Sequence, residues 1–258
     1  MASGKGSSSG INVWIQRLIA AFFLAGQTLV HLVQGKINRR NTLAQMIIVG
    51  PDSLGIALLT ASFVGMVFTI QVAKEFLYFG AGRVVGGVLA LALTRELAPV
   101  LTAVVIAGRV GSAFAAEIGT MRVTEQIDAL YILKTDPIDY LVVPRVIACC
   151  LMLPILTFLS LIVGLIGGLL IADGFFDISP VVFIDSIQNF LKVWDLWTAM
   201  IKSVVFGGLV AVIGCSWGMT TTGGAKGVGQ STTTAVVTAL LAIFIANFFL
   251  SWIMFQTT

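Results

Sequence analysis

The sequence predicts an all-α integral membrane protein, in which an N-terminal interfacial amphipathic helix is followed by five membrane-spanning helices. Three observations carry this prediction. Of the 258 residues, 58% are hydrophobic and only 10% are charged, whereas charged residues make up about a quarter of a soluble domain. Five apolar blocks are long enough to cross about 30 Å of hydrocarbon. Near the N-terminus, polar residues recur at helical spacing.

The first 50 residues divide into two parts. Residues 1–10 are rich in Gly and Ser and lack the blocks of a secretory signal, so we expect a flexible lead on a mature chain. Residues 11–50 should form the interfacial helix and a basic anchor. The anchor consists of Lys36, Arg39 and Arg40. A spanning helix is the alternative, but the uninterrupted apolar stretch from Leu18 to Gly26 is short for a crossing.

Residues 51–258 are expected to form a single five-span domain. The predicted spans lie at about 53–72, 84–107, 146–172, 199–219 and 234–254. Glycines at 164–168 and 207–208 would let helices approach closely, as small residues do in membranes. Between the third and fourth spans, aromatic residues in the segment 173–197 predict a short helix at the outer interface.

Basic residues predict which side of the membrane each connection faces. With a cytoplasmic N-terminus, ten Lys and Arg residues fall on the cytoplasmic side and four on the outer side, which favours this orientation and an outer C-terminus. The outer side then holds Lys74, Arg83, Lys192 and Lys202, with acidic residues that include Asp195. The longest cytoplasmic connection, 108–145, contains a helical stretch at 112–133 that Asp136-Pro137 would end, and it suggests a docking surface.

Arg95 and Glu96 lie near the middle of the second apolar block. An ionised side chain there costs at least about 2.5 kcal/mol unless it is paired or faces water. Pro99 comes four residues after Arg95 and removes a backbone hydrogen bond, so it should kink the helix beside the charges. One interpretation is a polar cavity for a substrate headgroup, lined by Arg95, Glu96 and Pro99. The alternative is a packing device in which both charges neutralise partners on neighbouring helices.

The predicted cytoplasmic connection carries opposite charges at helical spacing. These residues are Glu117, Arg122, Glu125 and Asp128. Weak pairs on a solvated helix face would explain them. The alternative is a coupling helix that fits a groove on a partner ATPase.

Several function classes find no support in the sequence. The formal charge of +3 is dispersed without a basic run, so no nucleic-acid partner is expected. Cys149, Cys150 and Cys215 show no metal-binding spacing. No nucleophile and base occur together, so we expect no catalytic residues, no metal, no cofactor and no enzymatic activity.

Two further features resemble ligand-binding motifs without meeting their requirements. The glycine-rich stretch 223–229 is reminiscent of a phosphate loop, but Gly227 follows Lys226 where ATP binding needs Ser or Thr, and no strand precedes it. We therefore expect no ATP binding there. His31 has no second His and no Cys or paired carboxylate near it in the sequence, so an interfacial polar residue is favoured over a ligand.

Several long motifs, taken together, resemble those of the MlaE (YrbE) permease family. They are LALALTRELAPV at 89–100, AGRVGSAFAAEIG at 107–119, MRVTEQI at 121–127, Asp136-Pro137 and Pro144-Arg145. The resemblance extends from the amphipathic segment to the C-terminus. The TTTGGAKGVG stretch at 220–229 is similar to the branch found in cyanobacteria and chloroplast inner envelopes.

This resemblance implies the permease of an MCE-type ABC transporter that moves glycerophospholipid between membranes. The expected partners are a second copy of the chain, a cytoplasmic ATPase and an MCE-domain protein. By the same resemblance, Arg95 and Glu96 match the charged pair at the family's lipid cavity, and 117–130 matches its coupling element. The expected location is a bacterial inner membrane, or the chloroplast inner envelope for a plastid protein.

Two other functions compete with this interpretation. An ion-coupled carrier without an ATPase would use Arg95 and Glu96 as a relay, although such carriers commonly contain internal repeats, which are not evident here. A membrane scaffold for an MCE complex would need neither charge for transport.

Overall fold

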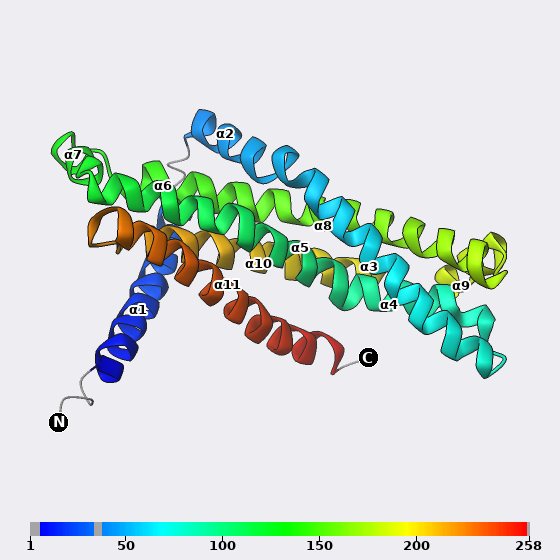
Figure 1. Ribbon diagram of the computed structural model, residues 1–258. Coiled ribbons are helices and arrows are strands. Elements are labelled where there is room, and N and C mark those ends of the chain that lie inside the picture. The colour runs from blue at the N-terminus through cyan, green and yellow to red at the C-terminus, as the bar shows by residue number, and fades with distance from the viewer. Residues whose placement is uncertain (1–5, 34–37, 257–258) are drawn as a thin grey trace, which may run out of the picture. The chain divides into compact units, whose positions relative to one another are not determined.

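The computed structural model describes residues 6–33 and 38–256, and for residues 6–13 and 33 it describes the backbone alone. Lys5, in the predicted lead, and Lys36, in the predicted anchor, lie outside the described residues. Within the described ranges the chain is helical and no strand occurs (Figure 1). The predicted all-α fold class is confirmed.

The helices contain the predicted blocks and extend beyond them. The first three are α1 Gly6–Val33, α2 Arg39–Val49 and α3 Pro51–Tyr78. A continuous helical run follows, made of η1 Gly82–Val84, α4 Val85–Ala92, η2 Leu93–Leu97, α5 Ala98–Ile106, η3 Ala107–Gly111 and α6 Ser112–Val123. The rest is α7 Gln126–Ile132, η4 Ile138–Val142, α8 Val143–Phe176, α9 Pro180–Phe190, α10 Val193–Met219 and α11 Gly224–Phe255. Of these, η2, η3 and η4 are π-helical turns.

Six helical runs in the described part of the chain are long and apolar enough to cross a membrane. Five of them contain the predicted spans. The sixth is Trp14–Leu32 of α1, with 19 residues. Polar Thr28 does not interrupt it, because its hydroxyl donates to the carbonyl of Leu24 at 2.7 Å. Length therefore does not exclude a spanning α1, and its interfacial placement stays a prediction. α1 begins at Gly6, so the second half of the predicted flexible lead is helical.

Contacts divide the chain into two compact units. The first consists of Met1–Met46, Ala107–Cys149 and Gly208–Ala242, and the second of Ile47–Ile106, Cys150–Gly207 and Ile243–Thr258. The connections predicted to be cytoplasmic belong to the first unit, and those predicted to be outside belong to the second. The predicted lead, anchor and single domain divide the chain along its sequence and not by contacts. These units do not test that division, and it stays a prediction.

In the second unit, small residues let helices come close together. The buried face of α3 repeats every four residues through Ser53, Ala57, Ala61, Gly65, Thr69 and Ala73. A Cβ at Gly65 would collide with the carbonyl of Gly164 in α8, so this crossing requires glycine. The expected close approach at 164–168 is confirmed. The predicted short helix after the third span is α9, whose Phe183 is buried in the same core cluster as Val85 of α4.

The first unit contains a similar crossing. A Cβ at Gly214 of α10 would lie 2.8 Å from the carbonyl oxygen of Gly111, and a Cβ at Gly218 would lie 2.7 Å from Cβ of Ile118 in α6. Close packing of this kind replaces the hydrophobic effect as the cohesive force between helices in lipid. It buries Phe114 and Trp217, which are at most 1% exposed.

Candidate functional site

A π-helical turn in the second unit holds the two charges predicted to form a site. η2 contains Arg95 and Glu96, and its wider turn is a geometry that is frequent at functional sites. Pro99 has no N–H, so the carbonyl of Arg95, four residues earlier, lacks its usual helical donor. The Nζ atom of Lys202 in α10 donates to that carbonyl oxygen at 2.7 Å. The proline thus leaves a backbone acceptor without a helical donor, and buried Lys202 donates to it.

Lys202 connects the backbone of η2 and the side chain of Glu96 with α11. Its ammonium group is fully buried and lies 3.0 Å from Oε1 of Glu96. It also donates to Oγ of Ser251 in α11 at 2.7 Å. Three acceptors therefore satisfy the three donors of the ammonium group. A buried charge with this complete set of partners is held in place.

Arg95 pairs with a second buried charge at the start of α10. Its Nε lies 2.8 Å from Oδ1 of Asp195, whose side chain is 1% exposed. The other oxygen, Oδ2, accepts from the backbone N–H of Lys192 at 3.0 Å. The ring of Phe255 lies 4.6 Å from the guanidinium carbon of Arg95, within the range of a cation–π contact. The side chain of Arg95 nevertheless remains 36% exposed.

Glu96 completes the network from the other side. Its Oε2 accepts from Nδ2 of Asn247 at 2.7 Å, and its Oε1 accepts from Oγ of Ser251 at 2.8 Å. Arg95, Glu96, Asp195 and Lys202 sum to a formal charge of zero. η2, α10 and α11 therefore meet through a neutral set of charges, in which Glu96 is 42% exposed.

The sequence places two members of this network only by their side of the membrane. Asp195 and Lys202 are predicted on the outer side, and the structure buries both against η2. Asn247 and Ser251 were not singled out. A signal was present, because Lys202 and Asn247 lie inside apolar blocks where a polar group needs a partner. The pairing is what the packing alternative requires, while the exposed parts of Arg95 and Glu96 are what a binding site requires.

The coupling residues predicted at 117–130 lie in the first unit. The single helix expected at 112–133 is wrong, because the chain forms α6 and α7 with a break between them. Glu125 stands at this break in the left-handed conformation, with φ at 61°. Arg122 and Asp128 pair across the break at 2.7 Å, with side chains that are 40% and 53% exposed.

Glu117 pairs with a residue outside the predicted coupling set. Its Oε2 lies 2.6 Å from Nη2 of Arg145 at the start of α8. Arg145 is 4% exposed and also donates to the carbonyl of Leu141 at 2.8 Å. This contact ties the beginning of the long connection to its end. Beyond it, Tyr131, Ile132 and Leu133 at the end of α7 expose 57%, 82% and 72% of their surfaces.

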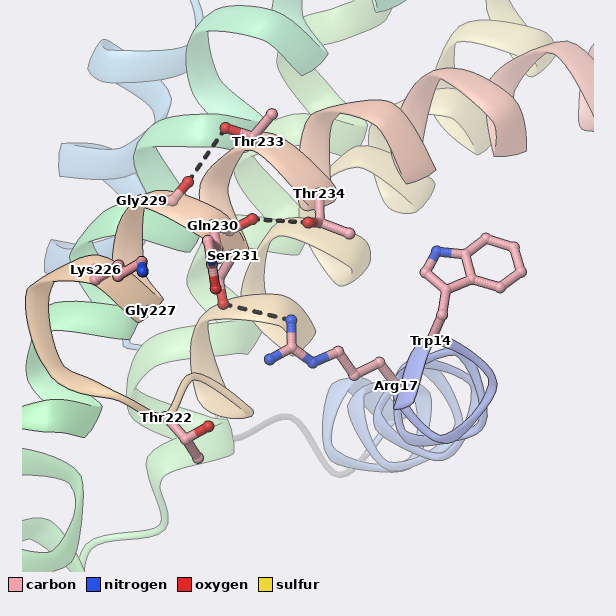
Figure 2. Close-up of a pocket in the computed structure, with 10 residues that line it drawn as sticks. All are labelled: Trp14, Arg17, Thr222, Lys226, Gly227, Gly229, Gln230, Ser231, Thr233 and Thr234. Carbon is pink, nitrogen blue, oxygen red and sulfur yellow. Dashed lines mark hydrogen bonds between the residues drawn. The ribbon is translucent and has the colours of Figure 1, made fainter. Parts of the chain in front are cut away.

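A pocket of about 700 Å³ lies in the first unit, between α1 and the first turns of α11 (Figure 2). Part of the glycine-rich stretch 223–229, which is reminiscent of a phosphate loop, lines it. Trp14 and Arg17 line it from α1, and Lys226 and Ser231 line it from α11. The stretch joins α10 directly to α11 without a strand, as expected.

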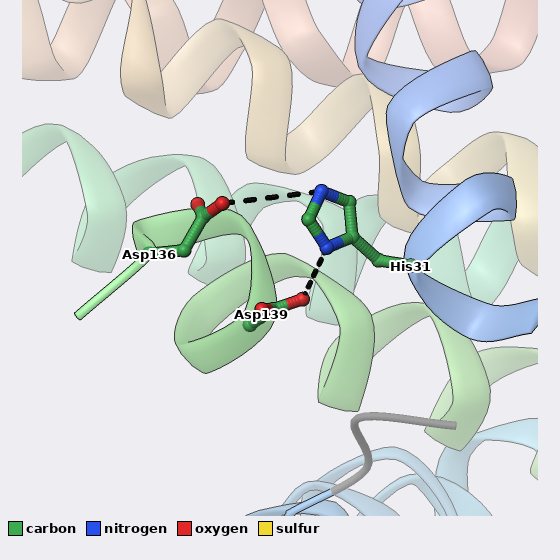
Figure 3. A group of neighbouring side chains, drawn as sticks. All are labelled: His31, Asp136 and Asp139. Carbon is green, nitrogen blue, oxygen red and sulfur yellow. Dashed lines mark ion pairs between the residues drawn. The ribbon is translucent and has the colours of Figure 1, made fainter. Parts of the chain in front are cut away.

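His31 has two carboxylate partners that its sequence neighbourhood does not show. Its Nδ1 lies 2.6 Å from Oδ1 of Asp139, and its Nε2 lies 3.9 Å from Oδ2 of Asp136 (Figure 3). The three side chains could supply a metal with one atom each. However, one metal ion binds a single nitrogen of an imidazole, and here each nitrogen faces a different carboxylate. The geometry favours an ion-pair bridge between α1 and η4.

Helices long enough to cross a membrane and a charge network within the spans define the chain as a polytopic membrane protein. The chain belongs to the MlaE permease family, because residues 42–253 match the family model described as Permease MlaE. The resemblance seen in the motifs is thereby confirmed. Relatives from Synechocystis sp. and Pyropia yezoensis are named probable ABC transporter permease proteins. A permease of that class implies an ATPase and a substrate-binding partner.

The chain is similar to proteins from cyanobacteria and plastids. It is 71% identical to a probable ABC transporter permease protein of Synechocystis sp., over 99% of this chain and 97% of that protein. It is 55% identical to the chloroplastic protein TRIGALACTOSYLDIACYLGLYCEROL 1 of Arabidopsis thaliana, over 94% of this chain and 69% of that protein. It is 52% identical to the probable ABC transporter permease protein ycf63 of Pyropia yezoensis, over 95% and 93%.

Proposed function

We propose that the chain is the permease of an ATP-driven MCE-type transporter that moves phospholipid between membranes. Two copies would form the lipid cavity, with a cytoplasmic ATPase and an MCE-domain protein as partners. Membership of the MlaE family supports this proposal, as does similarity to a chloroplastic relative whose name refers to a glycerolipid. The expected location is a bacterial inner membrane, or the chloroplast inner envelope for a plastid protein.

The observation that carries the proposal is the partly exposed Arg95 within a membrane span. In the described part of the chain, its hydrogen bond to Asp195 uses Nε alone. Among the described residues no hydrogen bond uses the donors on its two terminal nitrogens, so they are available to a ligand, and a guanidinium matches the geometry of a phosphate. Glu96 and Lys202 hold the turn that carries Arg95. The headgroup of a phospholipid is therefore the ligand that this site suits.

The contacts that hold Arg95 in place support a role in binding as well as in packing. Pro99 leaves the carbonyl of Arg95 to Lys202, so the backbone of the π-turn is fixed by a side chain of another helix. Asp195 fixes the guanidinium from α10. A binding residue positioned by locked neighbours loses little conformational entropy when the ligand arrives.

The connection between α6 and α8 suits the contact with the ATPase. Glu117, Arg122, Glu125 and Asp128 shape it through the pairs and the break described above. Ile132 and Leu133, at the end of α7, expose an apolar tip in a connection predicted to be cytoplasmic. An exposed apolar tip with a polar rim is typical of a protein interface. We infer that this tip inserts into a groove of the ATPase.

The contacts of α1 support its interfacial placement. Near one end, Arg17 donates to the carbonyl of Thr220 at 3.4 Å. Near the other end, His31 faces Asp136 and Asp139. Both partner segments belong to connections predicted to be cytoplasmic. A helix that crossed the bilayer would bring these two ends to opposite sides, about 21 Å apart along its axis.

Lipid transfer by the reconstituted assembly tests the proposal. The Arg95→Gln variant should lose most ATP-dependent transfer of labelled phospholipid between donor and acceptor vesicles, while it still copurifies with its partners. Arg83→Gln removes the same charge from an exposed position and is the matched control. It should transfer lipid at the rate of the unaltered chain.

Three results would contradict the proposal in different ways. Transfer that persists in Arg95→Gln would support a scaffold. Transport that depends on an ion gradient and continues without ATP would support a carrier. If Arg95→Gln no longer copurified with its partners, the role of Arg95 would lie in packing and not in lipid binding.

A further inference from the structure

The pocket beside α1 carries two cations in a place where the proposed function does not need them. Arg17 and Lys226 line it together with the indole of Trp14 and the hydroxyl groups of Ser231 and Thr222 (Figure 2). Its volume of about 700 Å³ is within the range of small-ligand sites. None of these residues belongs to the network around Arg95.

The two cations are not balanced within the pocket. Its described lining contains no Asp and no Glu. Arg17 donates to Oγ of Ser231 and to the carbonyl of Thr220, each at 3.4 Å, and both acceptors are neutral. Two positive charges without a carboxylate attract an anion, and long hydrogen bonds to neutral acceptors are easily exchanged for a charged one.

The glycine-rich stretch gives the pocket its shape. Gly223 and Gly224 have φ of +88° and +64°, which residues with a side chain rarely adopt. A Cβ at Gly227 would collide with the carbonyl of Thr222, so the chain folds back closely before α11 begins. This turn places Lys226 in the lining of the pocket on α11, while Arg17 lines it from α1 (Figure 2). The first turn of α11 adds backbone N–H groups without helical partners.

The pocket also lies where a headgroup is expected. The connection between α10 and α11 is predicted to be cytoplasmic, and Arg17 in α1 contacts it. The indole N–H of Trp14 donates to Oγ1 of Thr238 at 3.3 Å, while the side chain stays 38% exposed. Tryptophan with one polar contact and an exposed ring is enriched at the level of lipid headgroups.

We propose that this pocket binds the anionic phosphate group of a lipid headgroup from the cytoplasmic leaflet. The ligand sits between Arg17 and Lys226, and Ser231 and the first turn of α11 donate to its oxygens. The site is separate from the proposed lipid cavity. Through Arg17, it would make the attachment of α1 to the membrane depend on the anionic lipid content. It depends on the predicted orientation and not on the proposed transport.

Binding of anionic lipid to the full chain in its native assembly tests the proposal. The assembly is placed in phosphatidylcholine nanodiscs with increasing phosphatidylglycerol, and retained phosphatidylglycerol is counted by native mass spectrometry. The Arg17→Gln/Lys226→Gln variant should weaken retention about 25-fold, since each basic residue near an anionic surface contributes about fivefold. Lys74→Gln/Arg83→Gln removes one exposed Lys and one exposed Arg elsewhere and should change it less than about twofold.

Two further arms identify the source of the phosphate and exclude misfolding. Inorganic phosphate is added to nanodiscs of phosphatidylcholine alone and followed by phosphorus NMR. Binding of phosphatidylglycerol in preference to inorganic phosphate assigns the site to a headgroup, and the reverse assigns it to the soluble anion. The charge-conserving Arg17→Lys/Lys226→Arg variant should bind as the unaltered chain does. Equal losses in the pocket variant and the control pair, or loss in the charge-conserving variant, overturn the site.

Discussion

Two sets of charged residues, one in each unit, are held in opposite ways. In the second unit, Lys202 and Asp195 are at most 1% exposed, and each has partners on another element. In the first unit, Arg122 and Asp128 pair across a break with about half of each side chain in the open. Inside a span the protein must supply every partner, whereas in a connection water supplies most of them.

This difference separates the residues that hold the fold from those that are free to meet a partner. A charge removed from the buried network leaves another charge uncompensated in a low dielectric. A charge removed from the connection is replaced by water and ions. Variants of the two buried charges, Lys202 and Asp195, should therefore affect stability strongly, and variants of the α6–α7 connection should affect partner binding more than stability.

The largest effect is expected at Lys202. Replacement by Met should lower the free energy of unfolding by about 3 kcal/mol, because the carbonyl of Arg95, Glu96 and Ser251 would all lose a buried donor. Water compensates part of the loss at Glu96, which is 42% exposed. Unfolding of the purified protein in mild detergent measures this loss. Lys192→Met, at an exposed position, is the control. The Lys202→Met/Glu96→Gln double variant should recover part of the loss. Equal stability of Lys202→Met and the control Lys192→Met would contradict the comparison.

A smaller loss is expected at the other buried charge. Asp195→Asn should cost about 1.5–3 kcal/mol, the range of a hydrogen bond to a charged group. Arg95 is partly exposed, so water compensates some of its lost partner. The same unfolding experiment measures the effect, with Asp173→Asn at an exposed position as the control. A loss larger than that of Lys202→Met would reverse the order that burial predicts.

The bridge between α1 and η4 lies between the two extremes. His31→Gln should cost about 0.5–1.5 kcal/mol and increase hydrogen exchange in α1, because its side chain is only 19% exposed. Asp139→Asn should have the same effect. If the ion pair is responsible, the double variant should exchange no faster than either single variant. Additive effects would show that the two residues act separately.

The smallest effect on stability is expected at Arg122. Arg122→Gln should cost about 0.2–1 kcal/mol at low ionic strength and less at high salt, as exposed pairs do. Unfolding at two salt concentrations measures this difference, with Arg122→Lys as the charge-conserving control. A loss that approaches the value for Asp195→Asn and does not respond to salt would break the comparison between the units.

The sequence by itself determined the class of the protein and the existence of most helices. Apolar blocks of the right length imply membrane spans, because an unpaired backbone group in hydrocarbon is too costly for other structures. Arg95 and Glu96 stood out because ionised side chains are rare inside such blocks. The motifs around them were specific enough to indicate the family. Each of these conclusions depends on residues that are close together along the chain.

Only the tertiary structure decided which residues are partners. Asp195 lies 100 residues beyond Arg95, and Asn247 lies 151 residues beyond Glu96. The periodicity of a helix shows which face is polar but not which helix that face will meet. For the same reason, the sequence did not show the carboxylates around His31 or the pocket lined by Arg17 and Lys226. The break at Glu125 escaped prediction because residues 120–127 contain no Gly or Pro to mark it, and residues with a side chain rarely adopt the left-handed conformation that Glu125 has.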